Sequence, residues 1–324
     1  MARSILHAVP PLRQPDERLH GMLMKPPIHT EQISPRYVDL DSWSSAEMIE
    51  AMYEGQLAAT AAVRTALPAI AAAVEDAVPA LRRGGRLVYV GAGTSGRIGV
   101  QDGSELPPTY DWPSDRLVFL MAGGLSALVQ AVEDAEDKED VGAQSIADAL
   151  VGADDVVIAI AASGTTPFTI GALRAAGDAG AVTIAVANNP GAPLFDVARH
   201  AILADTGKEV IAGSTRMQAG TAQKIVLNLL STAIMVRLGR VYRGMMVSMR
   251  ARNAKLRKRA ERIVAHIVGC GTEQAADLVA RGDGEVKIAV LLGFGVEKER
   301  AIAALQRHDG NLRQAIDELV DDRS

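Results

Sequence analysis

The chain is poor in several residue types, and each shortage excludes a class of protein or site. Its single cysteine, Cys270, rules out an intramolecular disulfide framework and any multi-cysteine metal site. The six histidines form no HxxxH pair, so we expect no metal site. No apolar run approaches the roughly 18 residues of a membrane span. The N-terminal residues lack the apolar core of a signal peptide, which predicts a cytoplasmic protein that does not enter a membrane.

Aromatic residues are also scarce, and the net charge is negative. Aromatics make up 3% of the chain, although apolar residues reach 48% and are mostly Ala, Val and others of modest size. This bias is typical of helices packed closely over a parallel sheet. The net charge of −5 argues against a nucleic-acid partner. The length of 324 residues suffices for one large α/β domain and a smaller one.

Strand and helix patterns alternate through the middle of the chain. Short apolar runs that predict strands begin the segments 86–90, 116–124, 155–167, 182–191 and 200–207. Helical patterns occupy 44–56, where Ser44 and Glu47 fit a capping box, and then 126–150, 168–180 and 213–239. The alternation predicts an α/β fold: a three-layer αβα sandwich with a mostly parallel sheet. Right-handed crossovers then place the strand-to-helix loops along one edge of that sheet.

The two ends of the chain differ from this middle part. Residues 1–36 are rich in proline and lack periodicity, so we interpret them as a flexible N-terminal tail. Residues 37–268 form the expected sandwich domain with its N-terminal helices. Residues 269–324 form the last part, which from Gly284 onward contains three short helical patterns separated by Gly295 and Gly310. They resemble a small three-helix module of the ubiquitin-associated type.

Three loops along the expected edge share one chemistry. GAGTSG (91–96), ASGTT (162–166) and GSTR (213–216) each follow a strand and open a helix. Free N–H groups at a helix N-terminus bind anions without Lys or Arg, which predicts a phosphorylated small molecule. Any one loop alone is equally typical of helix capping. The candidate binding residues are Gly93, Thr94, Ser95, Gly96, Ser163, Gly164, Thr165, Thr166, Ser214 and Thr215.

The first loop also satisfies the spacing of a dinucleotide fingerprint. Gly91, Gly93 and Gly96 match G-x-G-x-x-G. The strand at 116–124, however, ends in Met-Ala-Gly-Gly and supplies no acid for a ribose. A compact phosphate fits the Thr94–Ser95 pair better than a pyrophosphate does.

Four motifs in order resemble the N-acetylmuramic acid 6-phosphate etherases, which have the sugar isomerase (SIS) fold. They are GAGTSGRIGVQDGSELPPT, AVEDAED, AASGTTPF and GSTRMQAGTAQKIVLNLLSTAIMVRLGRVY. The similarity runs from about residue 30 to about residue 268. The resemblance implies a cofactor-free lyase, acting as a homodimer, that releases D-lactate and N-acetylglucosamine 6-phosphate.

The same resemblance assigns two catalytic glutamates. The family's motifs around them match DGSELPP and DAED, which implies Glu105 and Glu136. Elimination needs a base for the C2 proton and an acid for the departing lactate oxygen, and water then adds with the roles reversed. We assign Glu136 as the base and Glu105 as the acid. Glu136 lies in the helix expected after the one that GAGTSG opens, so we expect the two glutamates to face one substrate from different sides. From its pattern alone, Glu136 is equally a solvated carboxylate in the acidic run EDAEDKED.

The chain departs from the family pattern at a few positions. Thr165 and Gln218 stand where the family usually has Arg and Lys. Two other functions remain open at this stage: a non-catalytic sugar-phosphate regulator, and an SIS isomerase of another hexose phosphate. Retention of Glu105 and Glu136 favours the lyase.

Overall fold

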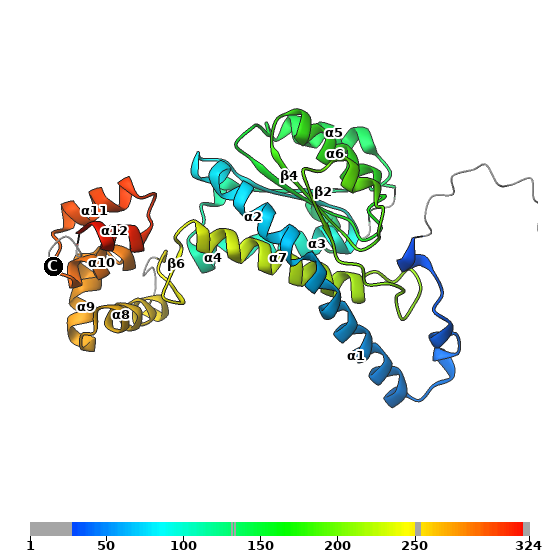
Figure 1. Ribbon diagram of the computed structural model, residues 1–324, viewed down its shortest axis with the longest axis horizontal. Coiled ribbons are helices and arrows are strands. Elements are labelled where there is room, and N and C mark those ends of the chain that lie inside the picture. The colour runs from blue at the N-terminus through cyan, green and yellow to red at the C-terminus, as the bar shows by residue number, and fades with distance from the viewer. Residues whose placement is uncertain (1–27, 131, 133, 250–253, 320–324) are drawn as a thin grey trace, which may run out of the picture.

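The computed structural model describes residues 28–130, 132, 134–249 and 254–319, and its centre is a parallel five-stranded sheet (Figure 1). The strand order is β2-β1-β3-β4-β5, and every neighbouring pair is parallel. Helices cover both faces, which confirms the predicted three-layer α/β fold. The strands are β1 (Leu87–Gly91), β2 (Leu117–Met121), β3 (Val156–Ile160), β4 (Val182–Ala187) and β5 (His200–Leu203).

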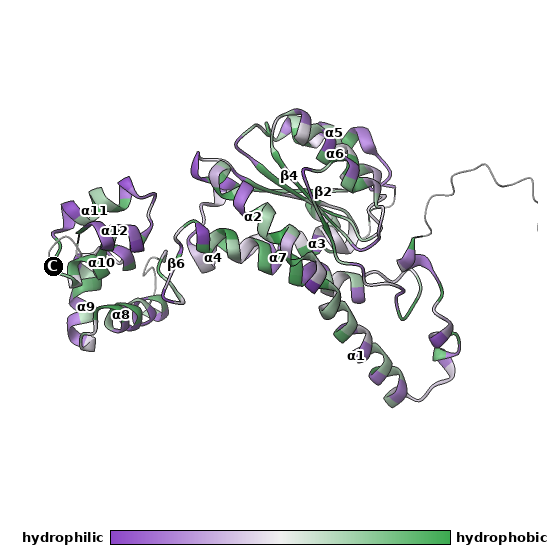
Figure 2. Cartoon of the chain, in the orientation of Figure 1, coloured by the Kyte–Doolittle hydropathy of each residue, from purple (hydrophilic) through white to green (hydrophobic). Residues whose placement is uncertain are grey.

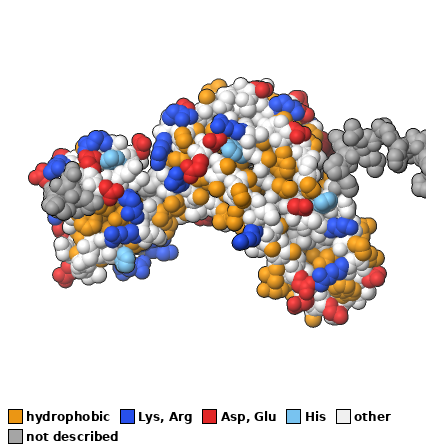
Figure 3. All heavy atoms as spheres, in the orientation of Figure 1, with side chains coloured by type: hydrophobic (Ala, Val, Ile, Leu, Met, Phe, Trp, Pro, Cys, Tyr) orange, Lys and Arg blue, Asp and Glu red, His pale blue; other side chains and the backbone are white. Residues whose placement is uncertain are grey.

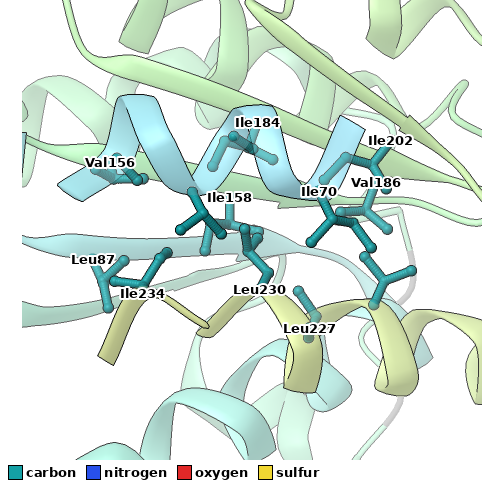
Figure 4. Packing of buried hydrophobic residues seen from close by; sticks show 14 of the residues in the cluster. Ile70, Leu87, Val156, Ile158, Ile184, Val186, Ile202, Leu227, Leu230 and Ile234 are labelled. Atoms are coloured by element: carbon teal, nitrogen blue, oxygen red, sulfur yellow. The ribbon is translucent and has the colours of Figure 1, made fainter. Parts of the chain in front are cut away.

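One face of the sheet packs against α2 (Leu67–Arg82), α3 (Gly93–Ser104) and α7 (Gln218–Arg237). Alternate strand residues such as Leu87, Ile158 and Ile184 point into this layer and are fully buried. Figure 4 shows them against Ile70 of α2 and against Leu227, Leu230 and Ile234 of α7. Because strand side chains alternate with period two, the intervening residues are left for the opposite face.

The opposite face packs against α5 (Glu139–Asp148) and α6 (Pro167–Asp178). These two helices approach each other closely. A Cβ on Gly142 would lie 2.0 Å from the backbone oxygen of Phe168, and one on Gly171 would lie 2.1 Å from that of Glu139. Glycine is therefore required at both positions by backbone proximity.

The segment before the sheet extends away from the sandwich. α1 (Ser45–Ala62) projects from its body in Figure 1 and continues through η5 (Val63–Ala66) into α2. Its predicted capping box is present: Ser44 accepts from the backbone N–H of Glu47, whose side chain accepts from that of Ser44. Of the predicted N-terminal tail, residues 1–27 lie outside the described residues. Thr30 is fully buried, and its backbone oxygen accepts from Gly213 N at 2.8 Å.

The C-terminal helices have a hydrophobic core of their own. The hairpin β6 (Val241–Tyr242) and β7 (Met245–Met246) leads from the sandwich to this part of the chain. The three helices predicted after residue 284 are present as α10, α11 and α12. The hydrophobic core of the C-terminal helices also includes the buried side of α8. The domain boundary that we expect after residue 268 stays a prediction. The helices are α8 (Ala254–Val268), α9 (Thr272–Arg281), α10 (Val286–Gly293), α11 (Lys298–Arg307) and α12 (Leu312–Leu319).

The helix expected over 126–150 is wrong in its first half. Residues Leu125–Leu128 form the 3-10 turn η7, and α5 begins only at Glu139. Asp134 has φ +57°, a left-handed conformation that an α-helix does not contain. Residues 134–138, which include Glu136, consequently form a loop.

Short elements complete the fold. They are η2 (His29–Glu31), η3 (Pro35–Tyr37), η4 (Leu40–Ser42), α4 (Leu106–Tyr110), η6 (Ser114–Arg116) and η8 (Pro193–Val197). Two helical stretches, Ser45–Arg82 and Gln218–Arg237, are long and apolar enough to cross a bilayer by length and composition. The second is α7, most of whose large apolar side chains lie in the core of the sandwich.

Candidate functional site at the carboxyl edge of the sheet

The first loop turns sharply between β1 and α3. Gly93 opens α3 with φ +50°, and a Cβ on Gly91 would lie 2.9 Å from Gly96 Cα. The turn is therefore accessible to glycine at these positions and to few other residues. It leaves Thr94 half-buried and Ser95 buried in the first turn of α3, with the N-terminal N–H groups of the helix around them.

A cavity of about 250 Å³ lies in front of this helix N-terminus. Gly93, Thr94, Arg97 and Glu136 line it together with small apolar residues. Arg97 donates from Nε and Nη2 to the backbone oxygen of Ala127, at 3.1 and 3.0 Å, and so fastens the η7 loop beside the cavity. The cavity thus combines helix N–H donors, a guanidinium and a carboxylate, which suits an anionic ligand that undergoes proton transfer.

Glu136 reaches this cavity from the loop before α5 rather than from a helix. Its backbone oxygen accepts from Phe168 N, in the first turn of α6, at 2.9 Å. This bond ties the glutamate to the start of α6, while the cavity places it beside Gly93 and Thr94 at the start of α3. The side chain of Glu136 is exposed to solvent.

The second predicted loop lines a different cavity. Gly164 has φ +68°, and Thr166 is the N-cap of α6 with Pro167 behind it. Ser163 and Thr165 bond to each other through their hydroxyls at 2.9 Å. Both line a cavity of about 280 Å³, and Thr165 is exposed to solvent.

The third predicted loop differs from the other two because the backbone N–H groups of the helix that follows it are already hydrogen-bonded within the protein. α7 begins at Gln218, and its first N–H groups already bind an internal anion. The carboxylate of the fully buried Glu209 accepts from Gln218 N and Ala219 N, both at 2.9 Å. Burial raises the pKa of Glu209, and these two bonds oppose the rise. Ser214 and Thr215 are half-buried and precede this capped N-terminus. A ligand at this loop therefore contacts the hydroxyl and backbone groups of these two residues, not the N–H groups that Glu209 occupies.

Glu105 lies at the far end of α3 from the first cavity. At about 1.5 Å per residue, the 12 residues of α3 separate Glu105 from Gly93 by about 18 Å. Pro107 and Pro108 stand in the short α4 that follows directly, so the chain does turn out of α3 at the glutamate. Glu105 is exposed, and one chain does not bring it to Glu136. The separation contradicts our expectation that the two carboxylates of a single chain face one substrate.

Asp102 fixes the helix that carries Glu105. It is buried and accepts from Tyr89 Oη at 3.0 Å and from Asn228 Nδ2 at 2.6 Å. Burial, with the Asp102 carboxylate second, raises the pKa of Tyr89 well above its usual value. These bonds join α3 to β1 and α7.

Several polar residues that hold the loops together were missed in the sequence. Asn189 Nδ2 donates to Ala162 O at 2.8 Å and to Thr30 Oγ1 at 3.1 Å, which connects the second loop to the N-terminal segment. Asn188 is fully buried and accepts from Gln223 Nε2 at 2.9 Å. The available signal was the pair of adjacent amides that follows the buried strand β4.

Two family models match the middle part of the chain. Residues 69–177 match the N-terminal SIS domain of glucokinase regulatory protein, and residues 125–233 match the SIS domain. Among solved structures, a phosphoheptose isomerase from Francisella tularensis is 22% identical, with a TM-score of 0.45, over 60% of this chain and 100% of its own.

The similarity to curated relatives extends over nearly the whole chain. The N-acetylmuramic acid 6-phosphate etherase of Deinococcus radiodurans is 50% identical over 296 residues, which cover 91% of this chain and 97% of the relative. The enzyme of the same name from Actinobacillus succinogenes is 46% identical, over 89% of this chain and 95% of its own. At this identity and coverage, the chain belongs to the N-acetylmuramic acid 6-phosphate etherase family, as its motifs predicted.

Proposed function

We propose that this protein is a lyase that cleaves the D-lactyl ether of N-acetylmuramic acid 6-phosphate. The products are N-acetylglucosamine 6-phosphate and D-lactate. The observation that carries this conclusion is the near full-length similarity to etherases of that name. The cavity at the start of α3 supports it, since it combines helix N–H donors for a phosphate with the Glu136 carboxylate.

The chemistry assigned to this site is an elimination followed by a hydration. Glu136 removes the C2 proton of the open-chain sugar, the C3–O bond breaks, and an acid protonates the oxygen that leaves with lactate. Water then adds its hydroxyl to C3 and a proton to C2, which gives the product sugar. The buried hydroxyl of Ser95 and the backbone N–H groups around it hold the phosphate throughout.

Glu105 takes the acid role in this proposal, and it acts on the substrate of a second copy of the chain. C2 and the ether oxygen on C3 are close neighbours, so both carboxylates must come within about 3 Å of them. The length of α3 keeps Glu105 about 18 Å from Gly93 in its own chain. A homodimer that places this exposed end of α3 over the partner's cavity supplies the missing carboxylate.

The helix α1 supports a homodimer. Its outer side carries the large apolar residues Ile49, Tyr53 and Leu57, which are 63%, 58% and 53% exposed. They follow each other at intervals of four and form one stripe. Figure 2 shows hydrophobic residues along the projecting helix, and Figure 3 shows apolar side chains on the surface of that projection. A second copy that packs on the stripe removes this apolar area from water.

The activity test is D-lactate release from N-acetylmuramic acid 6-phosphate by the purified protein. A protein that binds the sugar phosphate and releases no lactate would instead be the non-catalytic regulator. One that interconverts another hexose phosphate without lactate would be an isomerase. We also propose a cytoplasmic location.

The two glutamates are separated by isotope exchange. In deuterated water, Glu105→Gln is expected to exchange the C2 proton while it releases little lactate, and Glu136→Gln is expected to lose both activities. The reverse pattern would exchange their roles, and full lactate release by both variants would remove them from catalysis.

A mixing experiment tests the shared site. Each variant alone is expected to be nearly inactive, whereas a refolded mixture of the two recovers lactate release. A mixed dimer holds one site in which both glutamates are intact. Failure of the mixture to recover, with mixed dimers demonstrated, would place both glutamates in one chain's site.

A further inference from the structure

A second cavity, far from the sheet edge, is lined by four arginines. Arg82, Arg237, Arg243 and Arg313 line a space of about 610 Å³ between the sandwich and the C-terminal helices. This cavity, the arginine pocket, contains no Asp or Glu among the described residues that line it. Lys and Arg side chains flank the waist between the two parts in Figure 3. The volume is in the range of pockets that bind small molecules.

The arginine pocket is separate from the candidate active site. Arg237 is the last residue of α7, whose first residue, Gln218, lies near the carboxyl edge of the sheet. The 20 residues of α7 separate its two ends by about 28 Å. A ligand in the pocket therefore does not contact the cavity that holds Glu136.

Most of the positive charge in the pocket is not neutralised by carboxylates of the described residues. Arg237 forms a solvent-exposed ion pair with Glu75, at 3.0 Å. Within the described part of the chain, Arg82, Arg243 and Arg313 form no ion pair with a carboxylate. Arg82 instead donates to the backbone oxygen of Arg237 at 3.1 Å, which keeps these two guanidinium-bearing residues together. Like charges gathered in this way favour an anion between them.

Arg243 occupies a backbone position that favours other residues. It has φ +46° and precedes Gly244, with φ +76°, in the two-residue turn of the β6–β7 hairpin. Asn, Asp and Gly are preferred there, because arginine is strained in the left-handed region. The guanidinium lies 5.4 Å from the ring centre of Tyr242, and that of Arg313 lies 5.0 Å from the same ring. Backbone strain retained beside a cluster of cations points to a binding role.

We propose that the arginine pocket binds a small phosphate ester that bears hydroxyl or amide groups. Planar guanidinium groups recognise phosphate oxygens in pairs, and several of them suit a dianion. The side-chain amides of Asn311 and Gln314 also line the pocket and match hydroxyl or amide groups of the ligand. Because Arg82 and Arg237 belong to the sandwich and Arg313 to α12, the bound ester fastens the C-terminal helices to the sandwich.

Calorimetric titration at low ionic strength tests the site, with glycerol 3-phosphate and inorganic phosphate as probes. The key variant is Arg243→Asn, which removes the charge and suits the turn, so its thermal stability is expected to equal or exceed that of the wild type. Arg313→Gln is a second variant, in which glutamine is a good helix former on the exposed side of α12. Arg300→Gln removes an exposed charge on α11, away from the pocket, and is the matched control.

Each pocket variant is expected to bind glycerol 3-phosphate about tenfold more weakly or worse, since each loses a charge-assisted hydrogen bond. Arg300→Gln is expected to bind like the wild type. Wild-type-like binding by both pocket variants, or equal weakening by Arg300→Gln, would overturn the site. Equal affinity for the two probes would overturn the ester assignment and identify the phosphate ion as the ligand.

Discussion

Lys287 is expected to make the stability of the protein rise with pH above neutrality. It lies in α10 and lines a cavity of about 200 Å³ between the C-terminal helices and the sandwich. Its Nζ donates to the backbone oxygen of Gly310. Burial, followed by the nearby positive charge of Arg240, lowers the pKa of Lys287 from 10.5 to about 7, against a small opposing effect of Glu285.

The sign follows from the protons bound in each state. Between about pH 7 and pH 10.5 the unfolded chain keeps the Lys287 proton and the folded chain releases it, so unfolding takes up a proton. The free energy of unfolding therefore increases as pH rises through this window, and the penalty for the buried ammonium is largest at and below pH 7. Integration of the linkage relation between pH 7 and pH 9 gives an increase of about 2 kcal/mol.

The perturbation is Lys287→Met, which keeps much of the length of the side chain and removes its charge. Urea unfolding followed by circular dichroism gives the free energy of unfolding at each pH from 6 to 9. Apart from the effect of the lost hydrogen bond to Gly310, we expect the variant to have a larger free energy of unfolding than the wild type at pH 6 to 7. We expect this difference to disappear by pH 9. Lys258→Met, on the exposed side of α8, is the control and is expected to follow the wild type at every pH. Parallel pH profiles for Lys287→Met and the wild type would refute the reasoning.

Three other substitutions test the site and the packing. Ser95→Ala removes a hydrogen bond to a charged phosphate, so titration with N-acetylglucosamine 6-phosphate should show binding weaker by roughly 1.5–3 kcal/mol; unchanged affinity would place the phosphate elsewhere. Glu209→Gln leaves only one oxygen for the two N–H groups of α7, and we expect a loss of about 1–3 kcal/mol in urea unfolding. Gly142→Ala places a Cβ 2.0 Å from Phe168 O and should destabilise by about 1–3 kcal/mol, whereas Gly152→Ala, with open space around it, should not.

The sheet and the layers were predictable because their signals are local. The strands β1, β3 and β4 are short, mostly apolar runs that are buried on both faces, as expected of central strands in a parallel sheet. The capping box at Ser44 is a local signal of the same kind. Each of these features depends on residues a few positions apart, so the sequence alone identifies it.

The misread features depend on residues that are distant in the chain or on a single backbone angle. The helix expected over 126–150 was interrupted by the left-handed Asp134, which the acidic composition does not distinguish from an exposed helical residue. The N-terminus of α7 was expected to be free for a ligand. Instead, the carboxylate of Glu209, nine residues before Gln218, accepts from its N–H group. No rule based on residue spacing predicts that a glutamate in a loop caps a helix on the other side of a Ser/Thr-rich segment.

The location of Glu105 shows how a continuous motif divides in space. GAGTSG and Glu105 belong to one continuous sequence motif, and the motif alone suggests that both lie in a single site. The residues between them form α3, and a helix converts sequence separation into distance at about 1.5 Å per residue. Gly99 and Gly103 hold this helix against the sheet, where a Cβ would lie 2.9 Å from Ile160 and 2.6 Å from Phe119, so α3 cannot bend the glutamate back toward the loop. If both ends of the motif serve one reaction, the two ends belong to different copies of the chain, and the motif describes half of each of two sites.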